Sequence, residues 1–210
     1  MAQRIVVTGT DTGIGKTVFA AGLTALLGAS YWKPVQAGLT EETDACCVQR
    51  LADLADDRVI PEAYRLANPA SPHRAARLAG ISIDPVGLHP PAAGGRPVVI
   101  EGAGGVMVPL DSDTLFLDVF ARWQCPVVLC ARTSLGTINH SLLSLAALRS
   151  RGIDIIGIAF IGEASPDSED TICRLGAVRR LGRLPWLSPL DARSLQHAFA
   201  AQFRRTDFAR

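Results

Sequence analysis

The segment that most constrains this chain is a glycine-rich turn, GTDTGIGKT, at residues 9–17. An apolar run, RIVVT, precedes the turn at residues 4–8 and predicts a buried strand. The apolar periodicity of residues 16–27 predicts a helix directly behind the turn. Glycines allow the backbone to wrap closely around an anion, and the first turn of the helix adds the positive end of its dipole. The order of these elements therefore predicts a phosphate-binding loop.

Two polar residues at the end of the loop have the chemistry for binding a nucleotide. Lys16 can reach the outer phosphates, and the Thr17 hydroxyl can be a magnesium ligand. A Walker A motif has four residues between its first glycine and its glycine–lysine pair, whereas this loop has five. The alternative is a glycine-rich turn with an incidental lysine. We favour the phosphate loop, because strand, glycines, lysine, threonine and helix occur in the required order.

Short apolar runs alternate with segments of helical periodicity along the rest of the chain. We expect strands at residues 31–35, 97–101, 126–131, 153–161 and 184–187, and helices at residues 44–54, 139–151, 167–181 and 191–203, the first with Thr43 or Asp44 as its N-cap. This alternation predicts an α/β fold with a doubly wound, mostly parallel sheet and helices on both faces, as in P-loop NTPases. We expect a single domain over residues 1–210, with the proline- and glycine-rich stretch 88–97 as a surface loop.

Two carboxylates are candidates for holding a metal ion at the carboxyl edge of this sheet, where ligands bind in such folds. Glu101 ends an apolar strand and precedes the glycine-rich residues 102–105, which is the position of a Walker B acid. Asp44 begins the helix after the second strand, where it is a magnesium ligand, the N-cap of the helix, or both. Carboxylates suit magnesium because this ion prefers hard oxygen ligands.

Lys33 is the second lysine of interest, since it lies in an apolar segment, YWKPVQAG, immediately before Pro34. One interpretation is that its side chain extends to water from a sheet edge. The other is that its fixed positive charge stabilises oxyanions as they develop in a reaction. The residues alone do not separate the two interpretations, but a neighbouring phosphate loop favours the second.

Composition and charge narrow the classes of partner. Hydrophobic residues make up 48% and charged residues 20% of the chain, as in ordinary globular domains. The formal net charge is +1 and no basic run is present, so we expect neither nucleic acid nor a membrane as partner. No apolar stretch approaches the ~20 residues that span a bilayer, and the first apolar run is too short for a signal peptide.

The cysteines favour a reducing compartment. Five are present and none forms a CxxC pair, so we interpret them as reduced thiols of a cytoplasmic protein. A zinc site at Cys46 and Cys47 is disfavoured, because adjacent residues rarely both reach one metal ion.

The chain resembles the dethiobiotin synthetase family in the order and spacing of its motifs. The matching segments are GTDTGIGKT (9–17), YWKPVQAG (31–38), TDACCVQR (43–50), NPASPH (68–73), EGAGG (101–105), TSLGTINHSLL (133–143) and LPWL (184–187). The similarity covers nearly the whole chain. The five-residue gap in the loop and the INH segment are more specific than a Walker pattern alone.

The resemblance implies an ATP- and magnesium-dependent cyclo-ligase of biotin biosynthesis. Its substrates would be 7,8-diaminononanoate, carbon dioxide and ATP, and its products would be dethiobiotin, ADP and phosphate. One amine adds carbon dioxide to give a carbamate, ATP phosphorylates the carbamate, and the second amine closes the ureido ring. The protein would be a homodimer with the substrate site at the interface.

The resemblance also implies roles for individual residues. Lys16 and Lys33 would be catalytic. Magnesium would be held by Thr17, Asp44 and Glu101. The nucleotide would be bound by Gly13, Ile14, Gly15, Lys16, Thr17, Val18, Asp44, Glu101, Gly102, Ala103, Gly104, Pro185, Trp186 and Leu187. The substrate would be bound by Thr12, Lys33 and Ala37 and, across the dimer interface, by Thr137, Ile138 and Asn139.

Three positions depart from the family's pattern. Gly13 stands where some members have an acidic residue, and Ala37 stands where a serine or threonine is frequent. Ile161-Gly162 stands where relatives have an Asn-Asp pair that contacts adenine, which leaves the preferred base open.

Other functions of the same superfamily remain as alternatives. A partition or cell-division-positioning ATPase would have an extra lysine early in the loop, where this chain has Thr10, Asp11 and Thr12. A related amidoligase of the corrinoid-amidating type would need an additional glutaminase domain, for which 210 residues are too few. An inactive relative is a third alternative, because of Ala37 and Ile161.

Overall fold

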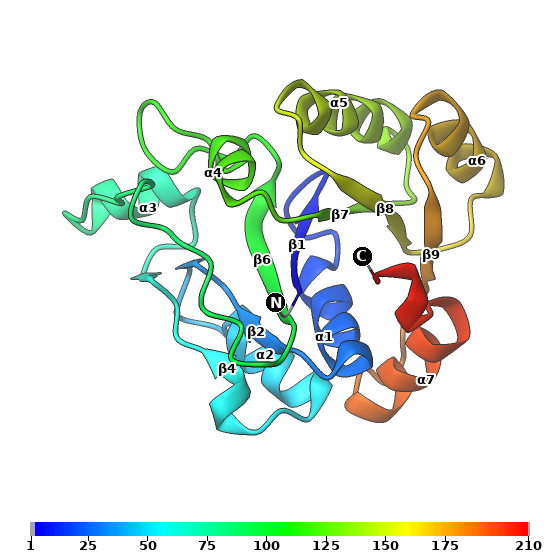
Figure 1. Ribbon diagram of the computed structural model, residues 1–210, viewed down its shortest axis with the longest axis horizontal. Coiled ribbons are helices and arrows are strands. Elements are labelled where there is room, and N and C mark those ends of the chain that lie inside the picture. The colour runs from blue at the N-terminus through cyan, green and yellow to red at the C-terminus, as the bar shows by residue number, and fades with distance from the viewer. Residues whose placement is uncertain (1–2, 210) are drawn as a thin grey trace.

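The computed structural model describes residues 3–209, which fold around a seven-stranded sheet with the order β4-β2-β6-β1-β7-β8-β9 (Figure 1). Its neighbouring strands pair in parallel. The strands are β1 (Arg4–Gly9), β2 (Ser30–Trp32), β4 (Val59–Ile60), β6 (Val98–Gly105), β7 (Val127–Arg132), β8 (Ile155–Ile161) and β9 (Arg180–Leu184). The predicted α/β class and the parallel sheet are confirmed.

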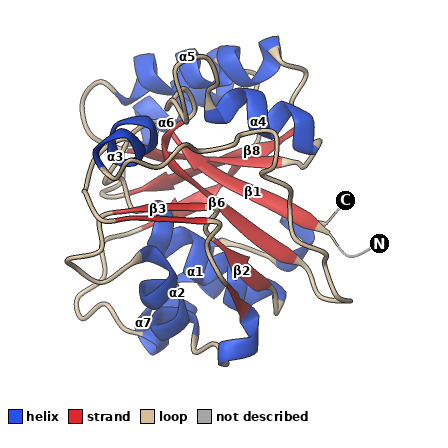
Figure 2. Ribbon diagram, turned by 90° about the vertical axis from the view of Figure 1, so that its left-hand side faces the viewer, coloured by secondary structure: helices blue, strands red, loops and turns tan. Residues whose placement is uncertain are grey.

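Helices cover both faces of the sheet, as predicted (Figure 2). One face is covered by α1 (Lys16–Leu27), α2 (Asp44–Ala52) and α7 (Ala192–Gln202). The other is covered by α3 (Pro72–Leu78), α4 (Phe116–Trp123), α5 (Thr137–Ser150) and α6 (Pro166–Leu175). Each face has its own core, because successive side chains of a strand point to opposite sides. In β1, Ile5 and Val7 join the first core and Val6 joins the second.

The strand predicted at residues 31–35 is two strands in two different sheets. β2 ends at Trp32, and after Lys33 and Pro34 the chain continues as β3 (Val35–Ala37), which pairs with β5 (Tyr64–Leu66). Pro34 has no backbone N–H to continue the first sheet. Its carbonyl oxygen instead accepts hydrogen bonds from the backbone amides of Ala63 and Tyr64. The change of sheet leaves Lys33 between two strands.

The predictions for the last strand and for the helix before it were also wrong. The helix predicted at residues 167–181 ends at Leu175, and the chain turns at Gly176 and Ala177, the latter with a φ of 41°. The strand predicted at 184–187 is β9, which lies four residues earlier at 180–184 because its backbone pairs with β8. No prediction was made for β4, β5, α3, α4 or the 3-10 helices Asp56–Arg58 and Arg205–Asp207.

Other local predictions are confirmed. Of the two N-caps predicted for α2, Thr43 is the correct one, since its side chain accepts a hydrogen bond from the backbone amide of Cys46. The alternative that Asp44 is the N-cap is wrong, because Asp44 is the first residue of the helix. Residues 88–97 form a loop without helix or strand. The five cysteines are free thiols. Within residues 3–209, no helix has both the length and the apolar character needed to cross a membrane.

The strand order places the phosphate loop at a crevice. β1 lies between β6 on one side and β7 on the other, so the chain winds away from β1 in both directions. In open parallel sheets, ligands bind beyond the carboxyl ends of strands at such a reversal point. The loop of residues 9–17 begins at the carboxyl end of β1, so this fold brings later strand ends alongside it.

We predict that Gly22→Ala lowers the free energy of unfolding by about 1–3 kcal/mol, as expected for an overpacked core. A Cβ atom at Gly22 in α1 would lie 2.2 Å from Cδ2 of Phe199, whose ring packs 4.4 Å from that of Phe203 in centroid distance. Alanine's better helix propensity, about 1 kcal/mol, offsets part of this cost. Urea unfolding measures the change. In a Phe199→Leu background the cost of Gly22→Ala should fall by half or more, and an unchanged cost would contradict the steric explanation.

Candidate active site

The phosphate loop has the backbone geometry that its glycines permit. Gly13 and Gly15 have positive φ angles of 69° and 91°, and Gly15 is the N-cap of α1. A Cβ atom at Gly9 would lie 2.8 Å from side-chain carbons of both Ile14 and Lys16. A side chain at Gly9 would therefore force Ile14 and Lys16 to move. The half-buried Val18 packs against the core on the α1 side.

Lys16 folds back over this loop. Its Nζ donates a hydrogen bond to the backbone carbonyl oxygen of Asp11 at 2.6 Å, and its side chain is buried. Burial lowers the pKa of Lys16, although the negative charge of Glu101 acts to raise it. The nearby positive charge of Lys33 lowers the pKa further. The loop therefore holds an ammonium group against one of its own carbonyl oxygens, close to a second cation.

Three oxygen-bearing side chains meet beside Lys16. The Thr17 hydroxyl lies 2.9 Å from Oδ1 of Asp44 and 2.9 Å from Oε1 of Glu101, within hydrogen-bond distance of both carboxylates. These are hard oxygen ligands of the kind that magnesium prefers, and they come from α1, α2 and β6. The residues present at this position therefore suit a magnesium ion.

Lys33 binds both carboxylates of this group. Its Nζ lies 2.6 Å from Oδ2 of Asp44 and 3.0 Å from Oε1 of Glu101, and it donates a further hydrogen bond to the carbonyl oxygen of Gly102 at 3.2 Å. Lys33 is 4% exposed and Glu101 is 1% exposed. The interpretation of Lys33 as a chain extending to water from a sheet edge is therefore wrong. The change of sheet at Pro34 turns its side chain inward.

The pKa values at this cluster reflect the pairing. Burial acts to lower the pKa of Lys33, but the charges of Glu101 and Asp44 outweigh it and raise the pKa above the ordinary value. Burial acts to raise the pKa of Asp44, but the charge of Lys33 outweighs it and lowers that pKa. Both groups are therefore held in their charged forms.

The prediction that Glu101 ends its strand is wrong. β6 continues through the glycines to Gly105, which is opposite Gly9 of β1. The glycines permit this because a side chain would not fit: a Cβ atom at Gly102 would lie 2.8 Å from the Phe120 ring. Glu101 nevertheless pairs with Val7 near the end of β1, which places its carboxylate level with the phosphate loop.

Two residues that the sequence analysis missed complete the cluster. The fully buried Tyr31 donates a hydrogen bond from its hydroxyl to Oε2 of Glu101 at 2.8 Å. Burial and the charge of Glu101 raise the pKa of Tyr31, so the phenol remains a donor. Oε1 of Gln36 accepts a hydrogen bond from the backbone amide of Asp44 at 3.2 Å. No local sequence signal could have found the contact of Tyr31 with Glu101, because it depends on β2 lying beside β6.

A cavity of about 380 Å³ opens beside Lys33. Its described lining includes six of the residues named from the sequence, which are Thr12, Lys33, Ala37, Asp44, Ala103 and Gly104. Ser71 and Gln36 also line it and were not predicted. Ala37 offers no hydroxyl to this cavity, whereas Ser71 does. Lys33 and the carboxylate of Asp44 therefore border a space that a small molecule could enter.

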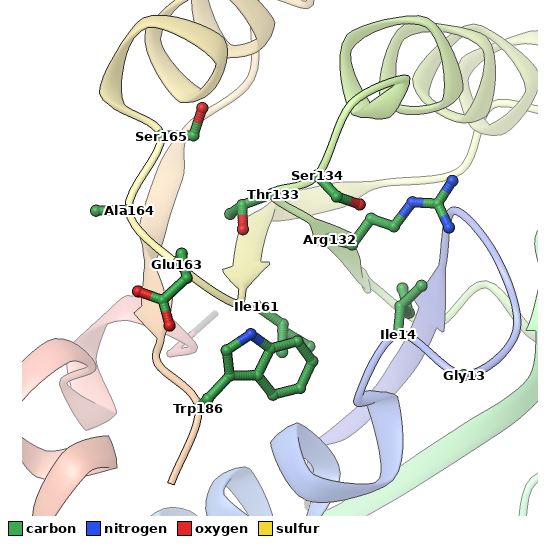
Figure 3. Close-up of a pocket in the computed structure, with 10 residues that line it drawn as sticks. All are labelled: Gly13, Ile14, Arg132, Thr133, Ser134, Ile161, Glu163, Ala164, Ser165 and Trp186. Atoms are coloured by element: carbon green, nitrogen blue, oxygen red, sulfur yellow. The ribbon is translucent and has the colours of Figure 1, made fainter.

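A second cavity, of about 390 Å³, lies on the other side of the phosphate loop (Figure 3). Gly13 and Ile14 form one wall, and the 62%-exposed indole of Trp186 forms another. Pro185, Trp186 and Leu187 were predicted to bind the nucleotide, and of these Trp186 alone is among the described lining residues. Leu187 packs against the core. Pro185 directly follows β9.

Polar residues of this second cavity were missed by the sequence analysis. They are Arg132, Thr133, Ser134, Glu163 and Ser165. Arg132 is the last residue of β7 and lies 3.5 Å from Oδ2 of Asp11, and Glu163 follows the end of β8. The rule that ligands bind beyond strand ends could have found both.

The pair Ile161-Gly162, which departs from the family's pattern, also lies at this cavity. A Cβ atom at Gly15 would lie 2.9 Å from Cγ2 of Ile161, so Ile161 packs directly on the phosphate loop. Gly162 has a φ of 126°, and a Cβ atom there would lie 2.6 Å from Oγ1 of Thr133. The backbone at Gly162 is therefore restricted to glycine by conformation and by space.

The predicted carboxylate-binding residues lie at the start of α5. Gly136 is the N-cap, and the buried Thr137 donates a hydrogen bond from its hydroxyl to the carbonyl oxygen of Arg132. Ile138 packs on the second core, and Asn139 is exposed. Among the described residues that line the cavity beside Lys33, none comes from 137–139. One copy of the chain does not bring them to that cavity.

Comparisons with known proteins agree with this geometry. A family model described as an AAA domain matches residues 3–194. A protein of Bradyrhizobium sp. (strain BTAi1) named ATP-dependent dethiobiotin synthetase BioD is 82% identical over 209 residues, which is 100% of both chains. A protein of the same name from Bradyrhizobium diazoefficiens is 62% identical and covers 99% of each chain. A third, from Brucella ovis, is 59% identical over 100% of this chain and 98% of its own.

Solved structures share the fold at low identity. The cell division ATPase MinD of Pyrococcus furiosus is 14% identical, with a TM-score of 0.54 over 95% of this chain and 98% of that chain. The MinC:MinD cell division protein complex of Aquifex aeolicus is 10% identical, with a TM-score of 0.55 over 95% of each chain. Because the first group of relatives matches over the full length at high identity, the chain belongs to the ATP-dependent dethiobiotin synthetase family, within the AAA-domain proteins that the family model describes.

Proposed function

We propose that this chain is an ATP-dependent ligase that closes 7,8-diaminononanoate and carbon dioxide to dethiobiotin in biotin biosynthesis. The observation that supports this most is the buried ammonium of Lys33 between Asp44 and Glu101, beside the phosphate loop and at the mouth of a cavity. A nucleotide switch has no need of a second buried lysine that faces a small-molecule cavity. The names of the full-length relatives support the same reaction.

The metal in this proposal is magnesium, held by Thr17, Asp44 and Glu101. Bound there, it would supply positive charge to the outer phosphates of ATP. Lys16 would neutralise the phosphoryl group from the loop side, and the backbone amides of residues 13–17 would hold the remaining phosphate oxygens.

The reaction requires two charged intermediates to be held in place. One amine of the substrate adds to carbon dioxide and loses a proton, which gives a carbamate. A carbamate oxygen takes the γ-phosphoryl group from ATP, and ADP leaves. The second amine then attacks the carbamate carbon, which closes the ureido ring and expels phosphate. Lys33 would stabilise the carbamate, and positioning by the protein would supply most of the rate.

The cavity beside Lys33 would hold the diamine, with Thr12 and Ala37 in its wall. We further propose that the distal carboxylate binds residues 137–139 of a second copy of the chain. The start of α5 suits an anion because of its free amides and its dipole. The substrate site would then lie at the interface of a homodimer.

The base of the nucleotide would occupy the cavity bounded by Trp186. In this proposal the indole stacks on the base, since it is 62% exposed and next to the phosphate loop. Ile161 offers no hydrogen bond, so base discrimination would depend on the polar residues at the rim.

The main alternative is a cell-division-type switch ATPase, and only the likeness of fold favours it. The start of the loop has Thr10, Asp11 and Thr12 and no lysine. Phosphate release measured with and without the diamine separates the two functions.

We predict that the purified chain forms dethiobiotin from 7,8-diaminononanoate, bicarbonate, Mg²⁺ and ATP, with one phosphate released per product. Mass spectrometry of the products and a phosphate assay measure this, and parallel reactions with GTP, CTP and UTP measure base preference. Phosphate release that continues at the same rate without the diamine would contradict the ligase and favour the switch ATPase.

We predict that Lys16→Ala abolishes ATP turnover, by about 10³-fold or more, while the fold is retained. The reason is that the loop loses the charge that faces the developing phosphoryl oxyanion. Product formation measures turnover, and circular dichroism with urea unfolding checks the fold. Full activity in a folded variant would contradict the assignment of residues 9–17 as the phosphate loop.

We predict that Lys33→Gln lowers kcat by about 10²–10³-fold and changes the Kd for ATP by less than fivefold. Lys33 borders the substrate cavity and not the nucleotide base, so its charge should matter mainly in the transition state. Isothermal titration gives the Kd, and Arg50→Gln, which breaks an exposed ion pair with Glu42, is the control. An unchanged kcat would exclude the proposed role.

A further inference from the structure

We propose that Tyr31 is a positioning residue of the metal site, whose hydroxyl fixes the orientation of the Glu101 carboxylate. The inference rests on the proposed function, in which Glu101 holds magnesium. Neither the phosphate-loop pattern nor the two-lysine pattern includes a tyrosine at this place. Tyr31 lies in β2, which is next to β6, and it pairs in register with Val99, two residues before Glu101.

The contact is buried and specific. The Tyr31 side chain is fully buried in the core between the sheet and α1, and its hydroxyl reaches Oε2 of Glu101 at 2.8 Å. A buried phenol loses its hydrogen bonds to water, so it requires a protein partner. Glu101, at 1% exposure, has the same requirement for both of its oxygens. Each group therefore satisfies the other.

The two oxygens of Glu101 have different partners. Oε1 accepts hydrogen bonds from Thr17 at 2.9 Å and from Lys33 at 3.0 Å, which belong to the proposed nucleotide and substrate sites. Oε2 accepts a hydrogen bond from the hydroxyl of Tyr31. A carboxylate anchored at both oxygens cannot rotate about its last bond without breaking a contact. Tyr31 therefore keeps Oε1 directed at Thr17, where Asp44 also converges.

This orientation matters because magnesium demands near-ideal octahedral geometry and tolerates little displacement of a ligand. Loss of a group that orients a metal ligand typically costs about 10–100-fold in metal affinity. Tyr31 touches neither nucleotide nor substrate in this arrangement, so its effect should appear in the metal dependence.

The test compares Tyr31→Phe with Tyr64→Phe, which changes the other tyrosine of the chain. Tyr64 also makes one hydrogen bond, as acceptor from the backbone amide of Asp84 at 2.9 Å, but away from the site. Binding of Mn²⁺ to the ADP complex, followed by electron paramagnetic resonance, is the first readout. The half-saturating Mg²⁺ concentration for turnover is the second. We expect Tyr31→Phe to weaken both about tenfold, and Tyr64→Phe to change neither by more than twofold.

A double-mutant cycle tests whether Tyr31 acts through Glu101. In a Glu101→Gln background, Tyr31→Phe should change Mn²⁺ binding by less than twofold, because there is no carboxylate left to orient. An equal loss in both backgrounds would overturn the proposal. So would a Tyr31→Phe protein that is less stable to urea but has normal Mn²⁺ binding, since that is the signature of a purely structural tyrosine.

The wild-type chain provides a measurement that does not depend on a variant at position 31. With 3-fluorotyrosine incorporated, the two ¹⁹F resonances can be assigned with Tyr64→Phe. Addition of Mg²⁺ with ADP should shift the Tyr31 signal and leave that of Tyr64 unchanged; an unmoved Tyr31 signal would overturn the proposal. Because these readouts need no dethiobiotin to form, failure of the ligase assay and failure of this inference are distinguishable.

Discussion

The buried contact of Lys33 with Asp44 and Glu101 is the interaction on which the site depends. Two carboxylates converge on one threonine hydroxyl, and one of them, Glu101, is buried. Like charges in such a position repel each other. The ammonium of Lys33 lies within 3.0 Å of both and compensates their charge. Loss of one member of a buried charge group is costly, because the remaining charge is left unpaired.

The fold supplies this cluster from three elements that are far apart in the sequence. Glu101 comes from β6, Asp44 from the first turn of α2, and Lys33 from the two-residue link between β2 and β3. The link exists because Pro34 cannot continue the first sheet. β1 lies at the centre, so its phosphate loop meets β6 on one side and the end of β7 on the other.

Two of the cavities beside the loop differ in the chemistry of their walls. The cavity at Lys33 has charged and hydroxyl groups in its wall and suits a polar substrate. The cavity at Trp186 has that aromatic side chain and Ile161 in its lining, and we propose that it binds the base of the nucleotide. Ala37 and Ile161, which depart from the family's pattern, each line one of them. Both changes remove polar groups from a wall and leave the phosphate loop and the charge cluster intact.

The sequence by itself determined the phosphate loop, helix α1, the parallel α/β class and the candidate groups Lys16, Thr17, Lys33, Asp44 and Glu101. It could do so because glycine spacing and apolar periodicity are local properties, and the glycines at 13 and 15 are needed for their positive φ angles. Tertiary structure decided the change of sheet at Pro34, the start of β9, the partnership of Tyr31 with Glu101 and the membership of both cavities. These depend on which strand lies beside which, and no local pattern states that a hydroxyl in β2 will face a carboxylate 70 residues later in β6.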